Sequence, residues 1–387
     1  MTPQTTPDHP SHAVTALQLT NFRNYAYAGL QPGTQSVVLT GHNGAGKTNI
    51  LEAVSLLAPG RGFRKAKISQ IDREGEGAFG GSCWAVAAEL YSAGQHLRVG
   101  TGRDPESEGD KRVVKIEGKR ARSQNQLAEF FSVVWLVPQM DQLFQDSEGT
   151  RRRFIDRLVY SFEPQHASRV SAYEHAMRER NRLLQSYQPD AAWLNALEQK
   201  MAENGVLIGY NRNILVDRLN KAIMMSDTSF PKADIALEGA IEQALADGVS
   251  ATDVEAEFAE ILAQQRRADA AASRALKGVH RSELRVRHVA KDMQAANCST
   301  GEQKAMLLSI MLAHARARAQ WHGAAPVILL DEVVAHLDQQ RRGELFDEIE
   351  AMGAQTWMTG TDAADFSGMQ GRASFWKVEQ GQISPGE

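Results

Sequence analysis

An α/β fold with an inserted helical lobe is predicted by three features of the sequence. The N-terminal part is rich in short apolar or alternating segments bounded by turn residues, at residues 14–20, 36–40, 84–91, 96–100, 112–117 and 133–137. A central part, residues 164–276, consists mostly of strong helix formers with few glycines. From about residue 280, strand-sized and helical segments alternate, which is typical of a parallel α/β sheet.

These segments divide the chain into three expected parts. The first half of the α/β part is expected at residues 1–160, an inserted helical lobe at 161–280, and the second half of the α/β part at 281–387. Strands are expected at residues 283–289, 327–330 and 355–359, and helices at 164–188, 191–225, 251–276, 300–320 and 339–352. An antiparallel meander is expected over residues 84–117, and its polar segment 102–110 predicts a mobile hairpin tip.

Composition limits where the protein acts and what it can bind. The 387 residues carry 43 basic and 47 acidic side chains, a net charge of −4, so any contact with nucleic acid must come from local basic patches. No run approaches the roughly 18 apolar residues of a spanning helix, so no membrane contact is expected. Residues 1–14 predict a loose tail and not a signal peptide. The cysteines Cys83 and Cys298 lack zinc-like spacing, which favours a reducing compartment, the cytoplasm.

A phosphate-binding loop is predicted directly after the strand at residues 36–40. The pattern G-x-x-x-x-G-K-[ST] is matched by Gly41, His42, Asn43, Gly44, Ala45, Gly46, Lys47 and Thr48. The glycines let backbone N–H groups converge on phosphate oxygens at the positive end of the next helix. Lys47 is expected to reach the β- and γ-phosphates of ATP, and the Thr48 hydroxyl to bind Mg²⁺. The alternative, a glycine-rich turn without a ligand, is disfavoured by the flanking strand and helix.

Two carboxylates end the apolar strand at residues 327–330. Asp331 is expected beside the phosphate loop, where it would hold Mg²⁺ directly or through water. Glu332 would then polarise the attacking water as general base. Because an apolar strand ending in Asp-Glu is common by itself, this prediction depends on the phosphate loop.

A third motif, Ser-Thr-Gly-Glu-Gln at residues 299–303, opens the helix that precedes Asp331. A serine at a helix N-cap followed by glycine can bind an anion through its hydroxyl, the free N–H groups and the helix dipole. The alternative is a plain capping box, in which Glu302 closes back on Ser299. Taken in isolation, the residues favour the capping box.

Together the three motifs resemble the ABC-type ATPases, which implies an ABC-type phosphate-loop ATPase head. In that class, a Ser-x-Gly-x-Gln signature of one subunit closes on nucleotide held by the phosphate loop of the other. The resemblance therefore implies an ATP-dependent, head-to-tail homodimer in which Ser299, Gly301 and Gln303 contact the second copy's nucleotide. It also implies a D-loop at Asp338 and a metal contact from the Q-loop residue Gln139.

The spacing of the motifs narrows the resemblance. Ser299 lies 299 − 47 = 252 residues after Lys47, farther than in transporter ATPases and much nearer than in SMC proteins. An insertion of that intermediate size is similar to the RecF family of bacterial recombination mediators. Further segments resemble the same family, at residues 17–25, 60–64, 138–141, 152–156, 278–281 and 299–304. One departure is Ser282, which precedes Glu283 where the family usually carries two acids.

The RecF resemblance implies ATP-dependent, sequence-independent binding to DNA at gaps. It implies RecA loading through RecO and RecR in recombinational repair, in replication and in the SOS response. Hydrolysis is expected to be slow and to open the dimer. At the level of residues, the resemblance implies nucleotide contacts from Asn21 and Arg23 and a γ-phosphate switch at Thr359 and Thr361.

Local basic clusters are the candidates for DNA contact. Four cations, Arg61, Arg64, Lys65 and Lys67, follow the first helix with no acid among them, which suits binding to phosphates without base reading. The alternative is an ordinary solvated face. Two further clusters lie at residues 119–122 and 151–157. For Arg152 and Arg153, within the latter, we expect salt bridges inside the head.

Three other functions fit parts of the sequence. The ATPase subunit of a membrane transporter is disfavoured by the long spacing between the phosphate loop and the signature. A small-molecule phosphate-loop kinase would have no use for the signature at Ser299. A short-arm, SMC-like head that tethers DNA without mediator partners stays open, and partner binding would separate it from a RecF-like protein.

Overall fold

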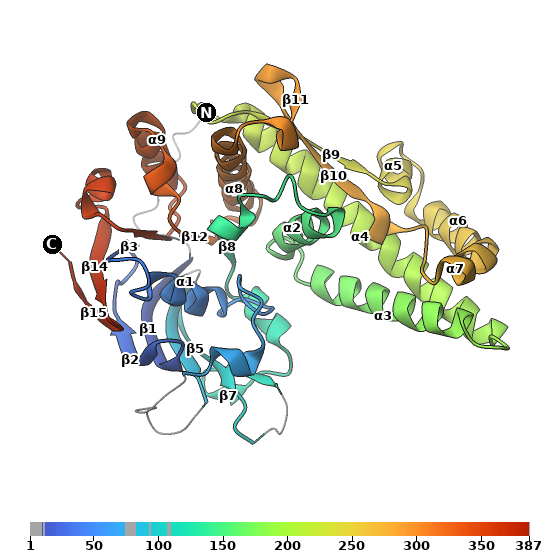
Figure 1. Ribbon diagram of the computed structural model, residues 1–387, viewed down its shortest axis with the longest axis horizontal. Helices are drawn as coiled ribbons and strands as arrows, with labels where there is room; N and C mark the ends of the chain where they lie inside the picture. The colour runs from blue at the N-terminus through green and yellow to red at the C-terminus, as the bar shows by residue number, and fades with distance from the viewer. Residues whose placement is uncertain (1–9, 11, 74–82, 93, 107–109, 387) are drawn as a thin grey trace. The chain divides into compact units, whose positions relative to one another are not determined.

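Two compact units make up the structure, a computed structural model that describes residues 10, 12–73, 83–92, 94–106 and 110–386 (Figure 1). Unit 1 comprises Met1–Asp141, Ser226–Phe230 and Leu307–Glu387, and unit 2 comprises Gln142–Met225 and Pro231–Met306. Unit 2 thus includes residues 142–160 and 281–306, which the sequence assigns to the head. The expected division into functional domains at residues 160 and 280 stays a prediction.

A six-stranded sheet in the order β15-β14-β3-β13-β12-β8 forms the core of unit 1. Its strands are β3 (Ser36–Thr40), β8 (Val133–Leu136), β12 (Val327–Leu330), β13 (Thr356–Gly360), β14 (Ala373–Glu379) and β15 (Gln382–Pro385). All neighbouring strands are parallel except β14 and β15. Strands β8, β12 and β13 are buried along their whole length, as parallel strands covered on both faces are. The carboxyl ends of the parallel strands share one edge, where the segments that follow β3 and β12 begin.

The second sheet of unit 1 is an antiparallel meander in the order β2-β1-β4-β5-β6-β7. Its strands are β1 (His12–Phe22), β2 (Tyr25–Leu30), β4 (Ala85–Ser92), β5 (Gln95–Arg103), β6 (Arg112–Ile116) and β7 (Lys119–Arg120). Helices α1 (Lys47–Ser55), α9 (Gln339–Ala351) and the part of α8 (Thr300–His322) from Leu307 onward complete the unit. The α/β class and the meander predicted from the sequence are thereby confirmed.

Strand β1 starts earlier than the sequence suggests. The loose tail predicted for residues 1–14 is wrong for His12, Ala13 and Val14, because these residues are buried and pair with β4. Residues 1–9 and 11 lie outside the described residues. The backbone N–H of Val14 also donates to the side chain of Gln355, just before β13, at 2.8 Å.

The hairpin between β5 and β6 is tied down on both sides of its tip. The Asp104 N–H donates to the Lys111 carbonyl at 3.0 Å. The Asp110 carboxylate accepts from the backbone N–H groups of Ile68 and Ser69 at 3.0 and 2.5 Å. These contacts hold residues 104 and 110 of the segment 102–110, for which the sequence predicts mobility. Residues 107–109 lie outside the described residues, so the mobility of the tip itself stays a prediction.

Unit 2 is mainly helical but carries its own small sheet. Its helices are α2 (Glu148–Tyr160), α3 (His166–Leu184), α4 (Ala191–Met225), α5 (Ala240–Ala246), α6 (Ala251–Gln264), α7 (Arg266–Ala272) and the first residues of α8. Figure 1 shows α3 beside the long helix α4. The sheet has the order β11-β10-β9, with β9 (Ala233–Glu238), β10 (Glu283–His288) and β11 (Met293–Gln294). Within the described chain, no helix has the length and apolar character to cross a membrane.

Two expectations for this region are wrong. Strand β10 does not join the parallel sheet but pairs antiparallel with β9, a strand within the block expected to be helical. The helix expected over residues 251–276 is divided at Gln265 into α6 and α7. Short 3₁₀ turns connect the elements of both units at Ile68–Ile71, Gln124–Glu129, Pro138–Met140, Val279–Arg281, Val289–Lys291, Ala295–Asn297, Val334–His336 and Ala363–Met369.

Buried ion pairs fasten the elements of unit 2 to one another. Arg212 on α4 forms a bidentate pair with Asp156 on α2, at 2.8 and 2.9 Å, and reaches Glu242 on α5 at 3.1 Å. Burial acts to raise the pKa of Asp156, but Arg212 and His166 together outweigh it and hold that pKa at about 2. On the far part of α3, Arg180 pairs with two further buried acids, Glu198 and Asp269.

The departure at Ser282 has a physical explanation in this network. The Ser282 hydroxyl donates to Glu242 at 2.6 Å, so an acid here would face a buried carboxylate. The next residue, Glu283, forms a bidentate pair with Arg151. Of the two arginines expected to form salt bridges, Arg152 lies 3.5 Å from Glu148, and Arg153 donates to the Thr150 hydroxyl. Both belong to unit 2 and not to the unit that holds the phosphate loop.

Removing Arg212 should destabilise unit 2 strongly and in a pH-dependent way. We expect Arg212→Met to cost about 3–5 kcal/mol at pH 7, because two carboxylates stay buried without their cation. The low pKa of Asp156 keeps its contribution to the parent constant between pH 7 and 5. In the variant, Asp156 loses the guanidinium that lowers its pKa and takes up a proton at a higher pH, so the penalty should shrink as the pH falls.

Hydrogen exchange of α4 amides at both pH values measures this loss. The matched control is Arg178→Met, which removes an exposed pair with Glu174 and should change stability by less than about 1 kcal/mol. A loss no larger than that of the control, or one that grows toward pH 5, would contradict the prediction.

Candidate nucleotide site

The phosphate loop joins β3 to α1 and depends on glycine at two positions. Gly41 has φ 145° and Gly46 has φ 117°, values that residues with a side chain rarely adopt. A Cβ on Gly41 would clash with the carbonyl oxygen of Val378, and one on Gly46 would meet the Tyr25 hydroxyl. The loop therefore packs closely against β14 and against the start of β2.

Lys47 lies across the loop. Its side-chain ammonium donates to the carbonyl oxygens of Gly41 and His42 at 2.6 and 3.0 Å, and the residue is only 4% exposed. Burial lowers the pKa of Lys47, while the nearby Glu332 and Asp331 act to raise it. The charge is thus held inside the loop, within reach of an anion that enters it.

Asp331 connects the phosphate loop to two strands. One of its carboxylate oxygens accepts from the Thr48 hydroxyl at 3.0 Å and from the Thr359 hydroxyl at 2.8 Å. Thr359 in turn accepts from the backbone N–H of Glu332 at 2.9 Å. Burial raises the pKa of Asp331, and the two hydroxyl donors act against that rise. The structure therefore brings together Thr48, Asp331, Glu332 and Thr359, all of which the sequence predicts as site residues.

Glu332 itself is half-buried and has φ 55°, in the left-handed region that is uncommon for a residue with a long side chain. The chain thus turns sharply at the two acids that directly follow β12. Thr361, the other expected switch residue, is exposed just beyond β13. Gln139 is exposed directly after β8, and Asp338 caps α9 by accepting the Arg341 N–H at 2.9 Å.

Asn21 and Arg23 have partners within the chain. Arg23 forms a bidentate pair with the buried Glu52 on α1, at 2.9 and 2.5 Å, and donates to the Gln70 carbonyl. Asn21 is buried and, like Arg23, has a positive φ. The expected nucleotide contact of both residues stays a prediction, and for Arg23 it would compete with Glu52.

Asn24 contacts the phosphate loop and was not predicted as a site residue. Its side-chain amide donates to the Ala45 carbonyl at 3.2 Å and accepts from the Asn49 amide at 2.7 Å. The sequence signal was its position at the end of the RecF-like opening segment, two residues after Phe22. Asn24 is therefore a candidate for holding the loop's shape.

The basic loop after α1 is held to that helix by one of its own cations. Arg64 donates to Glu52 and Asn49 at 2.9 and 2.6 Å, so this guanidinium is engaged within the chain. Arg61, Lys65 and Lys67 are exposed. The buried Arg112, also missed in the sequence, donates to the carbonyl oxygens of residues 56 and 60 and so fixes the start of the loop.

The signature residues belong to unit 2, whereas the phosphate loop and Asp331 belong to unit 1. Glu302 accepts from the backbone N–H and the hydroxyl of Ser299, at 3.0 and 2.9 Å, so a capping contact exists. Ser299 and Gly301 are nevertheless exposed. Gln303 is buried and donates to the Cys298 carbonyl at 2.8 Å, which shapes the turn before the helix and turns the side chain away from solvent.

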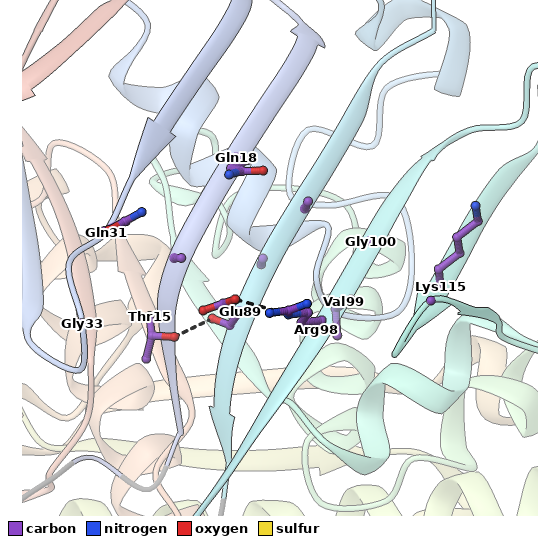
Figure 2. Close-up of a pocket in the computed structure, with 13 residues that line it drawn as sticks. Thr15, Gln18, Gln31, Gly33, Glu89, Arg98, Val99, Gly100 and Lys115 are labelled. Atoms are coloured by element: carbon purple, nitrogen blue, oxygen red, sulfur yellow. Dashed lines mark hydrogen bonds and ion pairs between the residues drawn. The ribbon is translucent and has the colours of Figure 1, made fainter.

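Among the hollows that the described residues of unit 1 form, two bear on the position of the site. One, of about 660 Å³, is lined by phosphate-loop residues 42–45 and by residues 378–382 around the β14–β15 turn. The other, of about 730 Å³, lies over the antiparallel sheet, and Figure 2 shows Thr15, Gln18, Glu89, Arg98 and Lys115 around it. No phosphate-loop residue lines the second hollow, so it is separate from the candidate nucleotide site.

Comparison with known proteins identifies the family. The family model described as "RecF/RecN/SMC N terminal domain" matches residues 13–384. The DNA replication and repair protein RecF of Mesorhizobium japonicum is 48% identical over 377 residues, which cover 97% of this chain and 98% of that protein. The chain belongs to the RecF family. RecF of Allorhizobium ampelinum is 45% identical over 373 residues, with 96% and 98% of the two chains covered.

Solved structures agree in fold. A structure described as "the recombination mediator protein RecF-ATPrS in RecFOR pathway" superposes with a TM-score of 0.83. It is 21% identical in sequence, with 97% of this chain and 99% of that chain covered. At this identity the match shows the fold, and it is the RecF form of the SMC-like ATPase head.

Proposed function

We propose that this RecF-family chain is an ATP-dependent DNA-binding protein of replication and recombinational repair. In this proposal ATP joins two copies head to tail, and slow hydrolysis separates them. The observation that carries it is the pair of hydroxyls, from Thr48 and Thr359, on one oxygen of Asp331. This contact brings the start of α1, the carboxyl end of β12 and the strand β13 together at the carboxylate of Asp331.

The residues at this point fit Mg-ATP. The loop offers Lys47 and closely packed glycines to phosphates, and Thr48 and Asp331 offer the hard oxygen atoms that Mg²⁺ prefers. Mg²⁺ bound there would neutralise negative charge on the phosphates. Gln139 is proposed as a further metal contact from the end of β8.

The chain's own residues then have distinct roles. Lys47 would exchange its two carbonyl partners for phosphate oxygens. Glu332 would accept a proton from the attacking water, with its backbone fixed by the Thr359 hydroxyl. Thr359 would thereby connect the site of the γ-phosphate to the base. Ser299 and Gly301, exposed at the start of α8, would meet the nucleotide of the second copy.

DNA binding is proposed for the exposed cations Arg61, Lys65 and Lys67. Arg64 contributes indirectly, because it ties this loop to Glu52 on the phosphate-loop helix. These cations would bind to DNA phosphates and not to base edges, as sequence-independent binding to gapped DNA requires. We further propose RecO and RecR as partners, RecA loading as the outcome, a part in the SOS response, and action in the cytoplasm. A DNA tether without partners is the alternative, and failure to bind RecR would favour it.

The role of Glu332 can be tested by separating binding from hydrolysis. Glu332→Gln removes the base but leaves Lys47, Thr48 and Asp331, so hydrolysis should fall by about 10²–10⁴ while the ATP-bound dimer persists. Single-turnover hydrolysis and sedimentation velocity measure the two effects. The control is Glu350→Gln on the exposed face of α9, which should change neither. Unimpaired hydrolysis in Glu332→Gln would exclude this residue as the base.

Salt dependence tests the proposed DNA contact. Replacing Arg61, Lys65 and Lys67 together by glutamine should weaken binding to every DNA sequence alike. It should also flatten the plot of log affinity against log salt, by up to about 0.9 in slope for each phosphate that the variant no longer neutralises. The matched control changes three exposed lysines of unit 2 outside the candidate basic clusters, Lys200, Lys221 and Lys277, to glutamine. An unchanged slope in the triple variant would show that this loop is only a solvated face.

A further inference from the structure

A lysine from a hairpin of unit 2 reaches the signature. Lys291 lies in the turn between β10 and β11, which reverses the chain with Asp292 at φ 49°. The backbone N–H of Lys291 donates to the His288 ring. Its side-chain ammonium forms an ion pair with Oε1 of Glu302, the acid within the signature. This ion pair connects the hairpin to the first turn of α8.

One carboxylate therefore has two kinds of partner. While Oε1 of Glu302 meets Lys291, Oε2 accepts from the N–H and the hydroxyl of Ser299 at 3.0 and 2.9 Å. The ion pair with Lys291 and the bonds from Ser299 lower the pKa of Glu302 to about 2, so the acid is charged at neutral pH. A charged carboxylate thus lies beside the serine.

That charge conflicts with the proposed ligand. The N-terminus of a helix attracts anions because its partial charge is positive, and an acid in the first turn offsets this charge. A capping box alone needs only Ser299 and Glu302. It does not need a cation brought from a separate hairpin, whereas an approaching polyphosphate would be repelled by an uncompensated Glu302.

We propose that Lys291 is a positioning residue of the signature, which neutralises Glu302 so that Ser299 and the helix N-terminus accept the polyphosphate held by a second copy of this chain. This inference rests on the proposed function, since it assumes that two copies close on ATP. It adds a residue outside the signature motif itself. Lys291 acts through Glu302, and its effect belongs to closure and not to nucleotide binding by one copy.

Dimerisation with ATP measures the effect, in the Glu332→Gln background to prevent turnover. We expect Lys291→Met to weaken the dimer by about threefold per site, the scale of an exposed ion pair, and so by about tenfold for two sites. Lys291→Arg should restore it. Lys200→Met, an exposed lysine on α4, is the control and should have no effect. Binding of a fluorescent ATP analogue to the dilute monomer is recorded in parallel.

Glu302→Gln separates charge neutralisation from simple capping. If Lys291 acts by neutralising Glu302, Glu302→Gln tightens the dimer, and Lys291→Met added to it returns the affinity to about that of the parent. If the ion pair only holds the cap, Glu302→Gln weakens the dimer as much as Lys291→Met does, and the inference is overturned. Equal dimerisation of Lys291→Met and parent overturns it as well. Absence of an ATP-dependent dimer in the parent overturns the proposed function together with the inference.

Discussion

The buried carboxylate of Asp331 is the contact on which the candidate site depends. A carboxylate taken out of water is costly unless donors reach it, and here the hydroxyls of Thr48 and Thr359 both bond to one oxygen. These donors come from α1 and β13, while Asp331 ends β12. Satisfying one acid therefore aligns the phosphate loop with the switch strand. The Thr359 hydroxyl also accepts a hydrogen bond from the backbone N–H of Glu332. The same threonine therefore bonds to both the proposed metal ligand, Asp331, and the proposed base, Glu332.

Unit 2 solves a different physical problem, which is to hold an exposed motif in a fixed position. Its interior contains the buried guanidinium groups of Arg180 and Arg212, each bonded to two acids. Such pairs contribute little net stability compared with apolar packing, but misaligned helices would leave their charges unpaired. The β10–β11 hairpin, whose turn contains Lys291, belongs to the same unit. A motif whose ligand is carried by another molecule benefits from a rigid support of this kind.

What the sequence could predict follows from the range of the interactions involved. The phosphate loop was predictable because strand, glycines and helix are adjacent in the chain. Asp331 was predictable because it directly follows an apolar strand in a chain that also carries a phosphate loop. The sequence could not predict the ion pairs that Arg23 and Arg64 form with Glu52. They join side chains of separate segments, and the hydrophobic pattern of the sequence does not show which segments meet. Strand β10 was expected in the wrong sheet, since alternation shows a strand but not its partner. The sequence also could not show that Ser299 stays exposed while it makes its capping contact with Glu302.

Complementation between two defective variants tests the central claim, that each nucleotide site is built from two copies. Lys47→Ala damages the phosphate loop and Ser299→Arg damages the signature. Each variant by itself should therefore fail to dimerise when ATP is added. In a head-to-tail mixed dimer both defects fall in one site, and the other site is intact. Sedimentation velocity of an equimolar mixture should therefore show ATP-dependent dimers, weaker than those of the parent. A mixture that stays monomeric while the parent dimerises would contradict the shared site.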